Sequence, residues 1–178
     1  MEKQKPVLVI FSGLPGTGKT TLAKEIAHYL GATHIRIDTI EQALRRSMLK
    51  INQVEDAGYE IGYAMAKDNL LLGNTVVADS VNPIEITREA WLLVAQEVGC
   101  ASIEVEVICS DSHEHQKRVE TRLSDIVGLK QPNWNDVITR EYHAWKREHI
   151  VINTAHKTVE VSKQELLSQL SSYLPKEQ

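Results

Sequence analysis

The chain has 178 residues, of which 42% are hydrophobic and 25% charged. This length and composition predict one domain over residues 1–178 with a sizeable core. Its 20 basic and 24 acidic residues give a net charge of -4, which disfavours nucleic acid and anionic membranes as partners. Two cysteines at no framework spacing, and no N-terminal apolar run of membrane-spanning length (roughly 20 residues), predict a cytoplasmic protein.

Apolar runs of strand length alternate with segments of helical period, which predicts a three-layer α/β fold with a parallel sheet and helices on both faces. The expected strands are VLVIFS from Val7, THIRID from Thr33, TVVADS from Thr75, SIEVEVICS from Ser102 and HIVINT from His149. Residues 19–30 predict a helix that ends at Gly31, and residues 39–73 predict two helices separated by NQVEDAG. A further helix is expected to begin with Asn82 as its cap and Pro83 in its first turn, and to run towards Gly99.

The stretch GLPGTGKT, residues 13–20, follows the first expected strand and opens the first expected helix. Its spacing fits a phosphate-binding loop, in which backbone N–H groups turn towards a phosphate. Lys19 would reach the β- and γ-phosphates of ATP, and Thr20 would hold Mg²⁺ through its hydroxyl. A glycine-rich turn that binds nothing is the alternative, but it would need neither side chain. The expected nucleotide-binding residues here are Gly13, Leu14, Pro15, Gly16, Thr17, Gly18, Lys19, Thr20 and Thr21.

Two carboxylates stand at the ends of expected strands, where ligands bind in such sheets. Asp38 ends the second strand and could accept the proton of an attacking hydroxyl. The stretch DTIE also reads as a helix cap, with Glu41 as its partner, and the two roles are compatible. Asp79 ends the third strand and could hold Mg²⁺, although a simple turn residue is the alternative.

Arg118 and Arg122 are four residues apart on an expected helix and would share one face. They could stabilise charge on a transferring phosphoryl group, or pair with Glu114 and Glu120 on a solvated face. Residues 124–137 interrupt the helical pattern and predict a lid over the site, with an ordinary surface loop as the alternative. His113 and His115 suggest a metal cluster, but neighbouring helix residues point in different directions.

Together GLPGTGKTTLAKEIA, IRIDTIEQAL, VVADSVNP, RVETR, PNWNDVITREYHAW and HIVINTA resemble the small P-loop kinases of AAA type, relatives of zeta-toxin and chloramphenicol phosphotransferase kinases. The resemblance covers nearly the whole chain. It implies the sheet order 2-3-1-4-5, Asp38 as the base, and Arg118 and Arg122 beside the phosphates. It also implies that Asn153, Thr154 and Ala155 lie near the adenine. Glu41 departs from the arginine that relatives with a sugar-nucleotide substrate often carry three residues after the base.

These features predict an ATP- and Mg²⁺-dependent phosphotransferase acting on a hydroxyl of a small molecule, as a monomer or homodimer. Residues 39–73 are the expected acceptor-binding region, and the expected substrate residues are Asp38, Arg45, Tyr59, Tyr63 and Asn82. Two alternatives remain open: an ATP-hydrolysing switch without an acceptor, and a polynucleotide 5′-hydroxyl kinase, which would need a basic groove.

Overall fold

The structure is a computed structural model that describes residues 5–49, 51 and 53–173. Five parallel strands form one sheet in the order β2-β3-β1-β4-β5. They are β1 (Val7–Ser12), β2 (Thr33–Arg36), β3 (Val76–Asp79), β4 (Ala101–Ile108) and β5 (Ile150–Asn153). The five expected strands and the order that the resemblance implied are confirmed.

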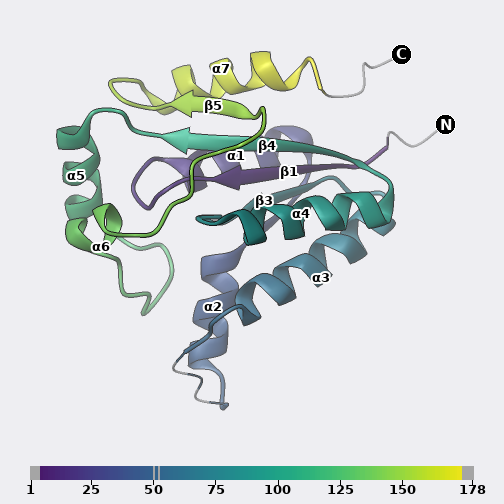
Figure 1. The fold of residues 1–178 in the computed structure, drawn as a ribbon, viewed down its shortest axis with the longest axis horizontal. Helices are drawn as coiled ribbons and strands as arrows, with labels where there is room; N and C mark the ends of the chain where they lie inside the picture. The colour runs from purple at the N-terminus through teal and green to yellow at the C-terminus, as the bar shows by residue number, and fades with distance from the viewer. Residues whose placement is uncertain (1–4, 50, 52, 174–178) are drawn as a thin grey trace.

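Helices cover both faces of the sheet and its carboxyl edge (Figure 1). On one face α1 (Lys19–Leu30) and α7 (Val159–Leu170) enclose one buried apolar cluster with the sheet. On the other, α2 (Ile37–Arg46), α3 (Ala57–Leu71) and α4 (Glu85–Val98) enclose a second. The short helices α5 (Ser112–Thr121) and α6 (Trp134–Ile138) lie beyond the ends towards which the strands point.

Membrane-spanning helices are not found: in the part of the chain that the structure describes, no helix is both long and apolar enough to cross a bilayer. The two helices expected within residues 39–73 are present as α2 and α3, with the break at residues 47–56. The helix expected at residues 19–30 is α1, and Gly31 ends it with a left-handed backbone.

The second strand is shorter than the sequence predicted. Strand β2 ends at Arg36, and helix α2 begins at the next residue with no connecting loop. The Ile37 side chain is buried in the apolar cluster between the sheet and helices α2, α3 and α4. This burial holds the first residue of α2 directly after the strand. Asp38 therefore lies in the first turn of α2 rather than at a strand end, and it is not the helix cap, because Arg36 occupies that position.

Asn82 does not cap the fourth helix as predicted. Helix α4 begins at Glu85 with Ile84 as its N-cap, and Asn82 lies fully buried with a φ angle of 46°. Its side-chain amide donates to the Phe11 carbonyl and the Ser12 hydroxyl, and its side-chain oxygen accepts a hydrogen bond from Trp91. These bonds tie the loop after β3 to the end of β1.

Candidate active site

The chain leaves β1 through a loop formed by residues 13–18. At two positions of this loop only glycine fits. Gly13 and Gly16 have φ angles of 143° and 86°. A Cβ atom on Gly13 would lie 2.3 Å from the Val107 carbonyl oxygen, and one on Gly16 would lie 2.5 Å from a methyl carbon of Val119. The loop is therefore wrapped tightly between β4 and α5 in a backbone shape that side chains would prevent.

Helix α1 starts where this loop ends, with Gly18 as an N-cap that offers no side-chain hydrogen bond. The first N–H groups of a helix have no partners within the helix and carry the positive end of its dipole. A helix start left open in this way favours the binding of a phosphate group. The predicted loop geometry is thus present, and its polar backbone groups are available for an anion.

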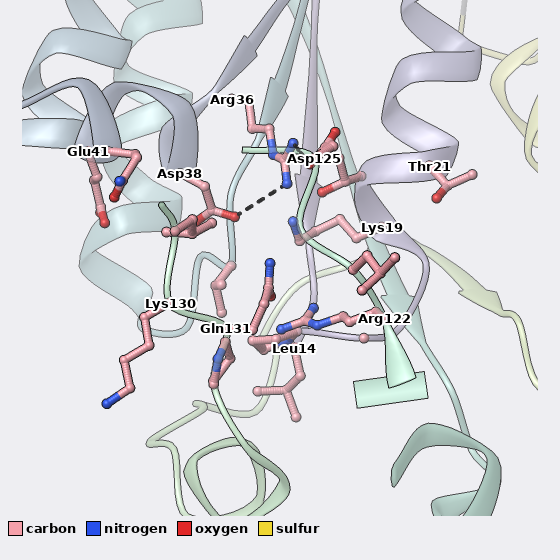
Figure 2. Close-up of a pocket in the computed structure, with 18 of the residues that line it drawn as sticks. Leu14, Lys19, Thr21, Arg36, Asp38, Glu41, Arg122, Asp125, Lys130 and Gln131 are labelled. Atoms are coloured by element: carbon pink, nitrogen blue, oxygen red, sulfur yellow. Dashed lines mark hydrogen bonds and ion pairs between the residues drawn. The ribbon is translucent and has the colours of Figure 1, made fainter. Parts of the chain in front are cut away.

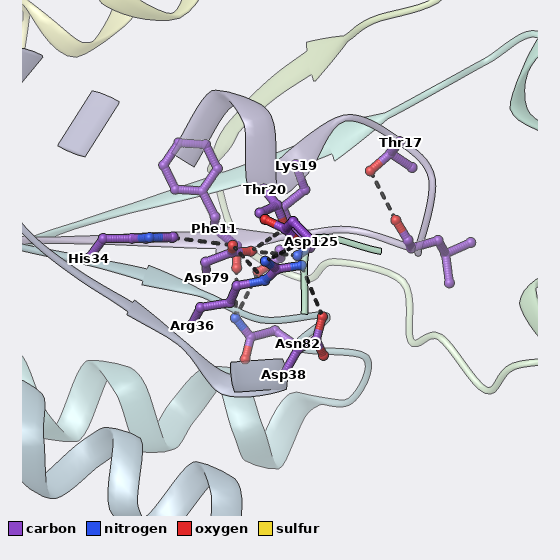
Figure 3. A network of polar contacts seen from close by, with 12 residues as sticks. Phe11, Thr17, Lys19, Thr20, His34, Arg36, Asp38, Asp79, Asn82 and Asp125 are labelled. Atoms are coloured by element: carbon purple, nitrogen blue, oxygen red, sulfur yellow. Dashed lines mark hydrogen bonds and ion pairs between the residues drawn. The ribbon is translucent and has the colours of Figure 1, made fainter. Parts of the chain in front are cut away.

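Asp79 is 1% exposed at the end of β3 and is surrounded by polar groups (Figure 3). Its Oδ1 atom accepts hydrogen bonds from Lys19 Nζ at 2.6 Å and from the Thr20 hydroxyl at 3.3 Å. His34 Nε2 lies 3.3 Å from Oδ2. Burial alone would raise the pKa of Asp79, but the Lys19 ammonium and the His34 ring outweigh it and hold the pKa well below its usual range. The carboxylate is therefore ionised at neutral pH and neutralises Lys19.

The same place offers the oxygen atoms that a magnesium ion favours. Thr20 Oγ1 and Asp79 Oδ1 are 3.3 Å apart, one a hydroxyl and the other an ionised carboxylate. Mg²⁺ binds hard oxygen ligands and usually keeps several waters, so two protein oxygens beside a phosphate site fit it. The residues predicted for the metal are thus adjacent and chemically suitable.

Two side chains that the sequence assigned to other roles support the phosphate-binding loop. His115, on α5, lies 2.8 Å from the Pro15 carbonyl oxygen through Nε2, and its ring packs edge-on against Trp134. Thr154 donates its hydroxyl hydrogen to the Thr17 carbonyl oxygen at 2.7 Å. The pair of histidines flagged in the sequence is therefore split: His115 braces the phosphate loop, while His113 is exposed.

A cavity of about 760 Å³ opens over this loop (Figure 2). One half, here called the phosphate-binding half, is lined by the loop and the start of α1. The other, called the acceptor half, is lined by α2 and by residues 128–140. Of the predicted site residues, the cavity brings together Leu14, Pro15, Gly16, Gly18, Lys19, Thr20, Thr21, Asp38, Arg45, Arg118 and Arg122.

Both predicted arginines reach the cavity but in different ways. Arg118 is anchored, because it donates to the Thr154 hydroxyl and carbonyl oxygens and pairs with Glu114. Arg122 follows the last turn of α5, and its half-buried guanidinium has a buried Nε atom without a hydrogen-bond partner in the described residues. Burial lowers the pKa of Arg122, and the neighbouring Asp38 carboxylate opposes this. Arg118 therefore forms the ion pair with Glu114 that the alternative interpretation predicted, and it also lines the cavity.

Asp38 stands between the two halves of the cavity. Its carboxylate is 46% exposed and lies 3.9 Å from the Arg36 guanidinium. Figure 2 shows it between Lys19 on one side and Glu41 on the other. An exposed, ionisable oxygen that faces the phosphate loop across a cavity is suitably placed to take a proton.

The predicted lid, residues 124–137, borders the cavity from Asp125 onwards. Asp125 accepts a hydrogen bond from Arg36 at 2.8 Å and also pairs with Lys24, and these two cations lower its pKa to about 2. The Gln42 amide donates to the Val127 carbonyl oxygen, which joins the segment to α2. Sequence reasoning missed Arg36 and Asp125, because nothing local marks residues that meet only in the folded chain. The segment ends in α6, which a capping box between Asn133 and Asp136 begins.

Three of the predicted substrate residues do not line the cavity. Tyr59 and Tyr63 pack on the core below the sheet, and Tyr63 meets the Trp91 ring edge-on with centroids 4.6 Å apart. Burial raises the pKa of Tyr59 to about 12. Asn82 has no exposed surface. Contact of these three residues with an acceptor stays a prediction, since among the described residues of 39–73 the cavity lining comes from α2.

The segment predicted to lie near the adenine packs under the phosphate loop instead of lining the cavity. Asn153 accepts hydrogen bonds from the Ser110 and Ala155 backbones, and Thr154 bonds the loop as described. Contact of these three residues with a base stays a prediction.

The sequence matches the model of a family described as AAA domain over residues 8–132. The chain belongs to this AAA-domain family. Among curated proteins it is 22% identical over 178 residues to a provisionally assigned adenylyl-sulfate kinase of Aeropyrum pernix, covering 88% of each. It is 31% identical over 137 residues to the Lon protease of Methanosarcina barkeri, but spans only 16% of that protein's length against 74% of this chain.

Solved kinases share the fold. A provisionally assigned kinase from Chloroflexus aurantiacus superposes with a TM-score of 0.72 at 19% identity, covering 95% of this chain and 98% of the other. The adenylyl-sulfate kinase CysC of Mycobacterium tuberculosis, solved with AMPPNP and APS, has a TM-score of 0.63 at 16% identity and covers 94% and 99%. The chain thus has a P-loop kinase fold, which implies a nucleotide-binding site, whereas a relationship to zeta-toxin kinases stays a prediction.

Proposed function

We propose that this protein is a phosphotransferase that moves the γ-phosphoryl group of Mg-ATP to a hydroxyl group of a small molecule. The observation that carries the proposal is the shared cavity: Lys19 and the open start of α1 border one half, and the Asp38 carboxylate faces them from the other. The fold that the chain shares with solved kinases supports the same class of reaction.

The residues of this chain would divide the work as follows. The backbone of residues 13–18 and the first turn of α1 bind the phosphates. Lys19 would exchange its contact with Asp79 for a phosphate oxygen, and Thr20 and Asp79 would hold Mg²⁺, which neutralises phosphate charge when bound. Arg122 would stabilise negative charge on the transferring group.

In the transfer step, the acceptor oxygen forms a bond to the γ-phosphorus as the bond from that phosphorus to the β,γ-bridging oxygen breaks. ADP leaves with that electron pair, and the hydroxyl proton passes to a carboxylate oxygen of Asp38. The lid would exclude water, which otherwise competes with the acceptor for the phosphoryl group.

The test is transfer from [γ-³²P]ATP to a panel of hydroxyl-bearing metabolites, nucleosides and antibiotics, with release of inorganic phosphate recorded in parallel. Transfer of label to one compound, lost in Asp38→Asn but retained in Lys117→Ala, is the expected result. Lys117 is exposed on α5 beside Arg118 but does not line the cavity, so it is a matched control. ATP hydrolysis at one constant rate, with no compound labelled, would instead favour the hydrolysing switch.

A further inference from the structure

The cavity lining is strongly basic although the chain as a whole is acidic. Eight lysine and arginine side chains line it against four aspartate and glutamate side chains, in a chain of net charge -4. A concave site lined by one sign of charge concentrates ligands of the opposite sign. The positions of these cations therefore indicate where anionic groups are expected.

Most of these cations already have a carboxylate. In the phosphate-binding half, Lys19 pairs with Asp79 and Arg118 with Glu114. At the lid, Asp125 pairs with Lys24 and Arg36.

In the acceptor half, Arg45 pairs with Glu41 at 3.1 Å. Three cations of the lining remain: Arg122, Lys130 and Arg140. Within the described ranges, no carboxylate oxygen lies within 4.0 Å of their charged nitrogen atoms.

The acidic side chains Asp136 and Glu41, which also line this half of the cavity, contact other groups. Asp136 Oδ2 accepts the Asn133 backbone N–H at 3.0 Å in the capping box that begins α6. Glu41 is held by Arg45. Among the described residues, neither carboxylate forms an ion pair with Lys130 or Arg140.

The three cations occupy different places. Arg122 lies beside Asp38, near the phosphate loop, and suits the nucleotide phosphates. Figure 2 shows Lys130 on the Glu41 side of Asp38, with its ammonium directed away from Lys19. The charge of Arg140 acts on Glu41, whose pKa burial raises and Arg140 lowers, so Arg140 also lies towards α2. Lys130 thus lies beyond Asp38 as seen from Lys19, and Arg140 lies close enough to Glu41 on α2 for its charge to act there.

We propose that the acceptor carries an anionic group, a carboxylate, phosphate or sulfate, which Lys130 and Arg140 bind while its hydroxyl lies at Asp38. The inference rests on the proposed function, because it assigns the acceptor half of the same cavity. A planar guanidinium and a lysine ammonium together suit an oxyanion, which accepts charge-assisted hydrogen bonds from both. A neutral sugar or alcohol would leave both cations without a counter-charge.

The test is a titration of the ¹⁵N-labelled protein, saturated with Mg-AMPPNP, with sodium sulfate, phosphate or acetate at constant ionic strength, followed by NMR chemical shifts. Nucleotide occupies the phosphate loop, so a second anion must bind elsewhere. We expect saturable shifts at α2 and residues 128–140, and an affinity at least tenfold weaker in the Lys130→Ala/Arg140→Ala variant. Lys117→Ala should bind as the unmodified protein does.

The three anions separate the possible groups: preference for acetate indicates a carboxylate, and preference for phosphate or sulfate indicates a tetrahedral oxyanion. Absence of saturable binding to the nucleotide complex, or equal binding by the double variant, would overturn the inference. Failure of AMPPNP itself to bind would instead overturn the proposed function, so the two failures are distinguishable.

Discussion

The two halves of the cavity are built by different means. The phosphate-binding half consists largely of backbone, with buried and fully bonded side chains behind it, such as Asp79 and Thr154. The acceptor half consists mainly of side chains from α2 and residues 128–140, among them the exposed Lys130 and Arg140. A half made of backbone binds what every nucleotide has in common, whereas a half made of side chains can differ between proteins and set the acceptor.

The largest expected effect, on activity and stability together, lies in the phosphate-binding half. Lys19→Met should lower kcat/KM for transfer by about 10³-fold, because it removes the cation that contacts the transferring group. It also leaves the buried Asp79 carboxylate without its ammonium partner, which should cost about 3–5 kcal/mol of unfolding free energy. Steady-state kinetics and urea unfolding measure the two effects.

The double variant Lys19→Met/Asp79→Asn separates stability from catalysis. Removing both charges should recover most of the lost stability but none of the activity. Recovery of activity together with stability would show that Lys19 acts only on the fold. It would contradict the assignment of Lys19 to phosphate binding in this half of the cavity.

Asp38 joins the two halves, and its loss should affect chemistry more than binding. Asp38→Asn should lower kcat by about 10²–10⁴-fold, the usual contribution of a general base. The dissociation constant of Mg-AMPPNP should change by less than about twofold, because the residue faces the acceptor and not the loop backbone. Glu41→Gln, one turn further along α2, is the matched control. An equal loss in both variants would contradict a specific role for Asp38.

Support beneath the loop should matter for nucleotide affinity. Thr154→Val keeps the side-chain shape but removes the hydrogen bonds to the Thr17 carbonyl oxygen and to Arg118. Each such bond contributes about 1 kcal/mol, so Mg-AMPPNP should bind about tenfold more weakly. Thr121→Val, which removes an exposed hydroxyl on α5, is the control. If calorimetry finds an unchanged affinity for Mg-AMPPNP in Thr154→Val, these hydrogen bonds do not contribute to nucleotide binding.

The smallest expected effect concerns the lid. Asp125→Asn removes a half-exposed carboxylate from the basic cavity, so ATP should bind only a few-fold more tightly, as exposed charges act weakly. The folded pKa of about 2 lies below the usual value, so the contact is complete above about pH 4 and is lost as the pH falls towards 2. The nucleotide dissociation constant of the unmodified protein should therefore not change between about pH 5 and 8 because of Asp125. A pH-dependent change of that constant in this range, absent from Asp125→Asn, would contradict this.

The sequence predicted the phosphate-binding half better than the acceptor half, for a physical reason. Glycine spacing, Lys19 and Thr20 lie within eight consecutive residues whose shape is set locally. Strand alternation likewise predicted the sheet, because each buried strand is continuous in the chain.

The errors fell where tertiary packing overrides local pattern. Asn82 has the residue type of a helix cap, yet Trp91 and the end of β1 take up its bonding groups. Tyr59 and Tyr63, expected near an acceptor from chain position alone, pack against the apolar cluster and do not line the cavity, so their contact with an acceptor stays a prediction. The contact of Arg36 with Asp125 joins residues 89 positions apart, and no local signal marks it.

The central claim is that the backbone start of α1, Lys19 and the Thr20–Asp79 oxygen pair form a site for a magnesium-bound nucleoside triphosphate. Calorimetric titration of the purified protein with AMPPNP, with and without Mg²⁺, tests it most directly. The account predicts one saturable site per chain that tightens when Mg²⁺ is present and is lost in Lys19→Met/Asp79→Asn. Equal heats for that variant and the unmodified protein, or no binding by either, would contradict it.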